Sequence, residues 1–226
     1  MGFFKVDTSE ENVRDYSGEG SAYINKSGIY DVVIKAVIVE KTQNGSEFLN
    51  LWIEHQGQEQ PIFQAMRLTN NDGSPNLGAK LFTKLCVILG ADNGQEITDP
   101  VSRMIPIGKG GEEKECMVLE DFDDMPVKMR VQMEYSIYDG KIQQSKTIRN
   151  FYRYTDNATA SEIINNSEEK GKQYASDEEY ADKVTYKDGL TEEEVQAWLK
   201  ERRSGKKDDT AKKPTQSTRR TFGKRA

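Results

Sequence analysis

Cationic and aromatic side chains concentrate between residues 126 and 154 of a chain that is otherwise acidic. This segment has only two acidic residues, Glu134 and Asp139, and its net charge is +4, whereas the whole 226-residue chain has a formal net charge of −6. Its six basic residues are Lys128, Arg130, Lys141, Lys146, Arg149 and Arg153. Clustered cations attract phosphates, and an aromatic ring beside them can stack on unpaired bases. The pattern favours single-stranded nucleic acid as a partner.

The same segment has the alternation of two strands joined by a turn at Asp139-Gly140. On the second strand, Arg149, Phe151 and Arg153 are two residues apart, so we expect them to share an exposed face with cations of the first strand. Phe151 would then stack on bases. The alternative is an ordinary solvated sheet face with Phe151 packed under a loop. The candidate contacts in this hairpin are Lys128, Arg130, Lys146, Arg149, Phe151 and Arg153.

Two more aromatic residues, Phe48 and Trp52, lie on one face of the predicted strand 47–54, and Leu49 and Leu51 lie on the other. They either stack on bases or lie buried beneath the N-terminal arm, since large aromatic side chains are mostly interior. Lys35 and Arg67 could extend the basic surface of the hairpin into a longer groove. We include all four among the candidate nucleic-acid contacts.

The sequence does not favour catalysis. The carboxylates of Asp121, Asp123 and Asp124 could hold Mg²⁺ in a nuclease, but an acidic surface loop is the commoner occurrence. There is one histidine, and the two cysteines, Cys86 and Cys116, have no paired spacing, which leaves too few ligands for a zinc site. We expect no enzyme, no metal and no cofactor.

The elements that must position these residues are mostly strands. Residues 30–39, 47–54 and 61–68 alternate apolar and polar side chains and should form an antiparallel meander, and the spacing of leucines after residue 76 predicts one helix to residue 90. Short strands are expected at 103–107 and 115–119, followed by the long hairpin 127–154. This order, five or more strands with one helix after the third, is that of an OB-like antiparallel barrel, although other small barrels share it.

Charge divides the chain further. Residues 1–154 have 17 basic and 23 acidic side chains, residues 155–201 have 5 and 13, and residues 202–226 have 10 and 2. We expect an N-terminal arm over 1–25, an OB-like domain over 26–154, an acidic segment over 155–203 and a disordered basic tail over 204–226. A capping box, Thr191 with Glu194, should open a short helix in the otherwise irregular acidic segment. No apolar run is long enough to span a membrane, and a cytoplasmic protein is expected.

Several of these motifs resemble a known family. The spaced residues Gly28, Tyr30 and Ile34, the turn Asn44-Gly45, the strand 48–51, the helix and the late basic hairpin are similar to phage-encoded single-stranded DNA-binding proteins with an OB-like fold. The resemblance covers roughly residues 26–154. It implies a protein that coats single-stranded DNA without strong sequence preference during replication or recombination, with homo-oligomers possible.

Many members of that family end in an acidic tail that recruits replication proteins. In this chain the acidic block is internal and the last residues are basic, so recruitment would have to use residues 156–201. The alternative is a protein-interaction or virion-associated scaffold that docks its partners through the charged tails.

Overall fold

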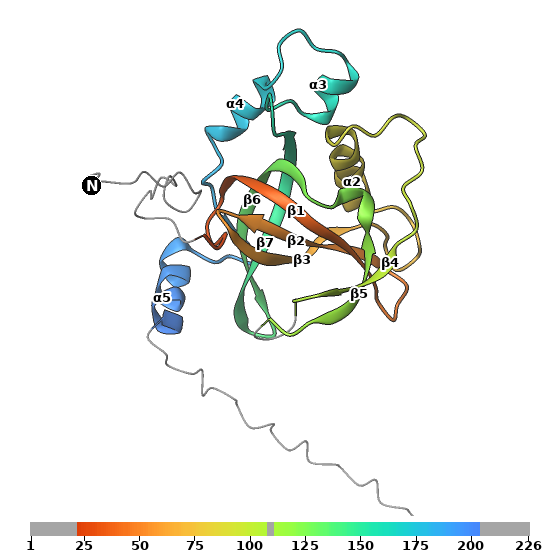
Figure 1. Ribbon diagram of the computed structural model, residues 1–226. Helices are drawn as coiled ribbons and strands as arrows, with labels where there is room; N and C mark the ends of the chain where they lie inside the picture. Colours follow the sequence, from red (N-terminus) through yellow and green to blue (C-terminus); the bar gives the residue numbers. More distant parts are fainter. Residues whose placement is uncertain (1–21, 108–110, 204–226) are drawn as a thin grey trace, which may run out of the picture.

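The computed structural model describes residues 22–107 and 111–203 (Figure 1). Strands dominate, as the alternating sequence predicted, and they form one sheet. The expected meander is confirmed: β1 (Gly28–Lys41), β2 (Glu47–His55) and β3 (Gln58–Arg67) pair in antiparallel order. The turn between β1 and β2 is closed by Gly45, whose φ of 83° suits glycine. These three strands form the part of the sheet on which the candidate site is built.

Helix α2 (Leu77–Ile88) follows the meander and confirms the predicted helix. It begins at Asn76, which caps the backbone N–H of Gly78. A Cβ atom on Gly78 would lie 2.1 Å from the backbone oxygen of Arg67, so glycine is required where the helix crosses the end of β3. Leu85 and Ile88 face the core, whereas Leu77, which had the same apolar spacing, is exposed.

Four other strands extend the sheet. They are β4 (Val101–Ile105), β5 (Lys114–Leu119), β6 (Met125–Tyr138) and β7 (Lys141–Arg153), with a short 3-10 turn, η1 (Glu120–Phe122), before β6. Strand β8 (Thr185–Tyr186) joins the sheet late in the chain and pairs in parallel with β6. Strand β1 is shared: residues 28–34 pair with β6, and residues 37–39 pair with β5. Among the described residues β3 pairs only with β2, and β7 only with β6. The antiparallel sheet is therefore not closed, and the expected closed barrel is not confirmed.

Two apolar clusters hold the sheet together. The larger one fills its concave side with residues that include Ile34, Leu51 and Met129 and is covered by α2. A second, smaller cluster lies on the other face of β1, where Ala36, Ile38, Trp52, Ile105 and Val118 pack together. The sheet is thus buried on both faces where β4 and β5 meet β1.

The acidic segment is more ordered than its composition predicted. It contains α3 (Ala160–Ile164), α4 (Lys172–Glu178), β8 (Thr185–Tyr186) and α5 (Glu192–Arg203), so the expectation of an irregular chain up to residue 190 is wrong. The capping box of Thr191 and Glu194 is confirmed, and a second one, Thr159 with Glu162, begins α3. Figure 1 shows α3 and α4 together at one end of the sheet and α5 apart from α2.

Contacts with the core explain this order. Val195 of α5 is 1% exposed and belongs to the main core cluster, and Trp198 packs edge-on against Tyr135. Tyr186 stacks on the same tyrosine, with ring centroids 6.0 Å apart. Three aromatic rings thus anchor residues 185–203 to β6.

The two predicted termini lie largely outside the described residues. This holds for residues 1–21 of the arm and for the basic tail 204–226. Residues 22–25 belong to the folded domain, because Ile24 is 1% exposed and joins the core. In the described part of the chain no helix is long and apolar enough to cross a membrane.

Candidate nucleic-acid interface

A bulge in β7 changes which hairpin residues face outward. Val131 pairs with Ile148 and Arg130 with Asn150, so Arg149 is an extra residue in β7. Because one added residue reverses the alternation of faces, Phe151 lies on the same side as Ile148. It is fully buried in the core. The prediction that Phe151 is an exposed stacking residue is therefore wrong.

Lys128, Arg130 and Arg149 face outward as predicted, but carboxylates neutralise them, and Arg153 shares the face of Phe151 at the end of β7. Arg130 Nη1 lies 2.6 Å from Asp177 Oδ1, and Arg149 Nη2 lies 2.5 Å from Glu134 Oε1. Arg153 pairs with Asp156 at 2.5 Å, and Lys128 with Asp31 at 3.2 Å. Asp156 and Asp177 belong to the acidic segment. The predicted basic face is thus an interface within the molecule.

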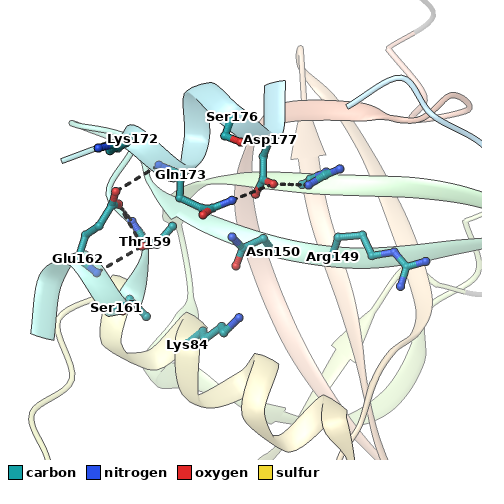
Figure 2. Close-up of a pocket in the computed structure, with 12 residues that line it drawn as sticks. Lys84, Arg149, Asn150, Thr159, Ser161, Glu162, Lys172, Gln173, Ser176 and Asp177 are labelled. Carbon is teal, nitrogen blue, oxygen red and sulfur yellow. Dashed lines mark hydrogen bonds and ion pairs between the residues drawn. The ribbon is translucent and has the colours of Figure 1, made fainter. Parts of the chain in front are cut away.

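Asp177 is the centre of this interface. Its carboxylate accepts hydrogen bonds from the hydroxyl of buried Tyr152 at 2.5 Å, from Arg130 and from Gln173. Burial by itself would raise the pKa of Asp177, but the Tyr152 hydrogen bond and the Arg130 charge outweigh burial and lower it. Figure 2 shows Asp177 and Gln173 directed toward each other above Asn150, while Arg149 points away from them. Helix α4 is thereby fixed on the hairpin.

Trp52 does not stand free on the surface, because it is 8% exposed and packs beneath β4 and β5 in the second apolar cluster. Its indole Nε1 donates a 2.7 Å hydrogen bond to Glu59. The prediction of Trp52 as a stacking residue is therefore wrong. Residues of β4 and β5 cover this ring, and not the N-terminal arm that was the expected alternative. Phe48 is half-buried below the guanidinium of Arg67, which lies 5.6 Å from the ring centroid.

The two cations predicted to extend the groove have partners of their own. Arg67 donates to Ser46, Asn71 and the backbone oxygen of Thr69, and so shapes the loop before α2. Lys35 forms an ion pair with Asp124. Neither lies with the hairpin cations in one groove.

An aromatic residue that sequence reasoning missed is exposed on the edge strand β3. The Phe63 side chain is 55% exposed on β3. It borders a hollow of about 630 Å³ over β1, β3 and β5, whose other lining residues include Lys41, Lys114 and Gln64. Lys41 pairs with Glu47 at 3.4 Å, and no ion pair of Lys114 is found in the part of the chain that the structure describes. The sheet thus presents an exposed aromatic ring beside a hollow.

Two carboxylates also line this hollow and set its electrostatics. Glu40 accepts a hydrogen bond from the Asn50 amide, and Glu115 accepts one from the hydroxyl of Ser102. With Lys41 and Lys114 opposite them, the formal charges of the lining side chains balance. This face would therefore bind nucleic acid through stacking of a base on Phe63 and not through net positive charge.

Phe63 lies beside an irregularity in β3. The register of β2 and β3 shifts between Leu49 and Leu51, and Gln64 takes a φ of 50°. The backbone N–H of Gln64 donates to Asn50 Oδ1 at 2.6 Å, while the Asn50 amide donates to Glu40 at 2.8 Å. Asn50 is 4% exposed. A buried asparagine in mid-strand needs such partners, so Asn50 was the sequence signal that could have indicated this irregular strand.

A second hollow, of about 550 Å³, lies on the other side of Phe63. It separates β3, at Gln60–Gln64, from β7, at Gln144–Thr147, and Tyr23 also lines it. Lys146 is half-buried there, and burial lowers the pKa of its ammonium group. Among the described residues Lys146 forms no ion pair. This cation is the one predicted contact that remains available in the hairpin.

The acidic patch does not form a metal site in the described ranges 22–107 and 111–203. Asp121 accepts hydrogen bonds from Thr98, Asp123 pairs with Arg103 and Asp124 pairs with Lys35. Each carboxylate thus has a structural role. A comparison with protein-family models finds no match to this chain, and a comparison with curated proteins finds no relative.

Proposed function

We propose that this protein binds single-stranded DNA without strong sequence preference, on the outer face of β1, β2 and β3. The observation that carries the proposal is Phe63, an exposed aromatic side chain between two hollows of a sheet. Stacking on an aromatic ring tolerates any base and contributes about 1–3 kcal/mol per base. Such a face suits a protein that coats unpaired strands and does not read their sequence.

The arrangement of elements supports the same proposal. Three antiparallel strands, one helix and then further strands follow the order of an OB-like fold, in which the face of the second and third strands binds oligonucleotides. Phe63 lies on that third strand. Phosphate contacts would come from Lys114 and Lys146 beside the ring and from residues 204–226, which have eight basic and two acidic side chains. The protein acts in this proposal without catalysis.

The test is fluorescence anisotropy of a labelled oligo-dT strand, titrated with the protein over a series of salt concentrations. We expect binding that weakens with salt and a matched duplex that binds much less well. Phe63→Ala should weaken binding by roughly tenfold, because one stacked base is lost. Tyr180→Ala is the matched control, since this ring is also exposed but lies in the acidic segment. It should leave the affinity unchanged.

The hairpin is tested in the same titration. Arg149→Ala with Arg153→Ala should change the affinity less than Phe63→Ala does, because both arginines are paired with carboxylates. If the double arginine variant abolishes binding while Phe63→Ala has no effect, the binding site is on the hairpin and not beside Phe63. No binding to oligo-dT at low salt would refute the proposed function itself.

A protein-docking role is the second candidate, favoured by one observation. A hollow of about 850 Å³ lies between α2, α3 and the loop after α2, and apolar side chains such as Phe82, Val87 and Ile163 line it. Ile164 beside it is 70% exposed. In a scaffold protein Val87→Asp would abolish partner binding and leave oligo-dT binding intact.

A further inference from the structure

A hollow lined mainly by polar side chains, of about 700 Å³, lies where α2, α3 and α4 meet the hairpin (Figure 2). We call it the polar hollow. Four of its lining side chains are basic and two are acidic, so their formal charge is +2. The two hollows beside Phe63 have formal charges of 0 and +1. The basic residues of the polar hollow are Lys84, Arg130, Arg149 and Lys172, and the acidic ones are Glu162 and Asp177.

The two carboxylates of the polar hollow are engaged by groups other than its lysines. Asp177 is paired with Arg130 at 2.6 Å. Glu162 accepts hydrogen bonds from the backbone N–H groups of Thr159 and Gln173, at 2.7 and 3.3 Å. Neither carboxylate forms an ion pair with a lysine in the described part of the chain. The charges of the two lysines are therefore not neutralised by the carboxylates beside them.

The lysines also lack strong partners elsewhere. Lys84, on α2, forms no ion pair with any residue of 22–107 and 111–203. Lys172 reaches Glu169 only at 4.0 Å, and the two side chains are 81% and 84% exposed. An ion pair exposed to this extent contributes little. Both ammonium groups thus remain available to an anion.

Hydroxyl and amide groups lie between these cations. Ser161 and Ser176 line the polar hollow, and Figure 2 shows Lys84 on α2 below Asn150 of β7. Ammonium and hydroxyl groups are the donors that proteins commonly direct at phosphate oxygens of nucleic acids. The lining therefore suits a phosphate group better than an apolar ligand.

Strand β7 connects the polar hollow with the stacking residue. Residues 144–147 line the hollow between β3 and β7 beside Phe63, and Arg149 and Asn150 line the polar hollow. Thr147 and Asn150 are three residues apart, which corresponds to roughly 10 Å along a strand. A nucleic-acid strand that stacks a base on Phe63 can therefore follow β7 to the polar hollow.

We propose that the polar hollow binds a phosphate group of the single strand whose base stacks on Phe63, with Lys84 as the main cation and Lys172 as the second. The inference rests on the proposed function and adds to it a contact that is separate from the stacking ring. The bound strand then extends from β3 across the end of β7 to α2 and α4.

The experiment is the salt dependence of anisotropy for labelled oligo-dT of about 16 nucleotides, the upper site size of one OB fold. The logarithm of the association constant falls linearly with the logarithm of salt concentration, by roughly 0.7 per phosphate contact on a single strand. Lys84→Gln should therefore lower the magnitude of this slope by roughly 0.7. Lys80→Gln is the matched control, because Lys80 is also exposed on α2 but does not line the polar hollow. It should leave the slope unchanged.

A second measurement uses the protein without substitutions. Single lysines are acylated by a limiting amount of an N-hydroxysuccinimide ester, with and without saturating oligo-dT, and read by mass spectrometry. Oligo-dT should slow acylation of Lys84 and leave that of Lys80 unchanged. Equal slopes for Lys84→Gln and Lys80→Gln, or a Lys84 rate that oligo-dT does not alter, would overturn the inference and leave the proposed function intact. A wild-type protein that does not bind oligo-dT at low salt would refute both.

Discussion

Phe151 shows how a single extra residue in a strand decides the role of a side chain, and Phe63 lies beside a larger irregularity. Phe151 is fully buried because the bulge at Arg149 turns it toward the core, whereas Phe63 is exposed beside the irregularity at Gln64. A bulge leaves the residue types unchanged, and a period-2 pattern therefore predicted the strands but assigned Phe151 to the wrong face. For Phe63, only buried Asn50 indicated an irregular strand.

The two phenylalanines should separate stability from binding. Phe151→Ala removes a fully buried ring and should lower the free energy of unfolding by about 3–5 kcal/mol. Phe63→Ala should change it by no more than about 0.5 kcal/mol, as surface substitutions usually do. Urea denaturation followed by circular dichroism gives both values. A large loss of stability in Phe63→Ala would mean that this ring packs against a part of the protein and is not available for stacking.

At the scale of elements, α4 is held on the hairpin by one carboxylate. Asp177 accepts hydrogen bonds from Tyr152 and Arg130, and the side chains of the ion pair are only 15% and 18% exposed. Asp177→Ala leaves the guanidinium and the hydroxyl without this partner and should lower the free energy of unfolding by about 3 kcal/mol. Asp182→Ala, an exposed carboxylate of the same segment, is the control and should have almost no effect. Urea titration of the three proteins provides the comparison, and equal stabilities would show that α4 is held by other contacts.

The elements differ in how well the sequence predicted them, for a physical reason. The strands β1 to β7 and helix α2 follow from apolar periodicity, which is a local property. The order in residues 155–203 depends on contacts with distant residues: Asp177 with Arg130, Lys187 with Glu134, and Val195 with the core. Composition alone indicated a solvated acidic segment, because contacts between residues far apart in the sequence cannot be predicted from the sequence of a short segment. The candidate cations were thus identified, but their neutralisation was not.

At the scale of the whole molecule, the uneven charge of the sequence is largely compensated within the fold. The acidic segment supplies Asp156 and Asp177 to the basic hairpin, and the hairpin's own Glu134 is shared by Arg149 and Lys187. The net charge of a segment therefore does not predict an exposed charged surface here. Two hollows remain open on the sheet: the neutral one beside Phe63 and the one between β3 and β7 beside Lys146.

This compensation makes stability depend on acid pH. For Glu134 and Asp177, burial would raise the pKa, but hydrogen bonds and neighbouring cations lower it; for Asp156 the Arg153 hydrogen bond is the main cause of a lowered pKa. Carboxyl groups with a depressed folded-state pKa stabilise the fold fully above their unfolded pKa values of about 4, and this contribution is lost as pH falls through the folded-state values. The free energy of unfolding should therefore change little between pH 7 and 5 and fall steeply below about pH 4. Urea titrations at pH 7, 5, 4 and 3 measure this, and Asp177→Asn should show a shallower fall, because one of the three groups no longer titrates. An equally steep fall in Asp177→Asn would assign the acid sensitivity to carboxylates outside the contact between the hairpin and α4.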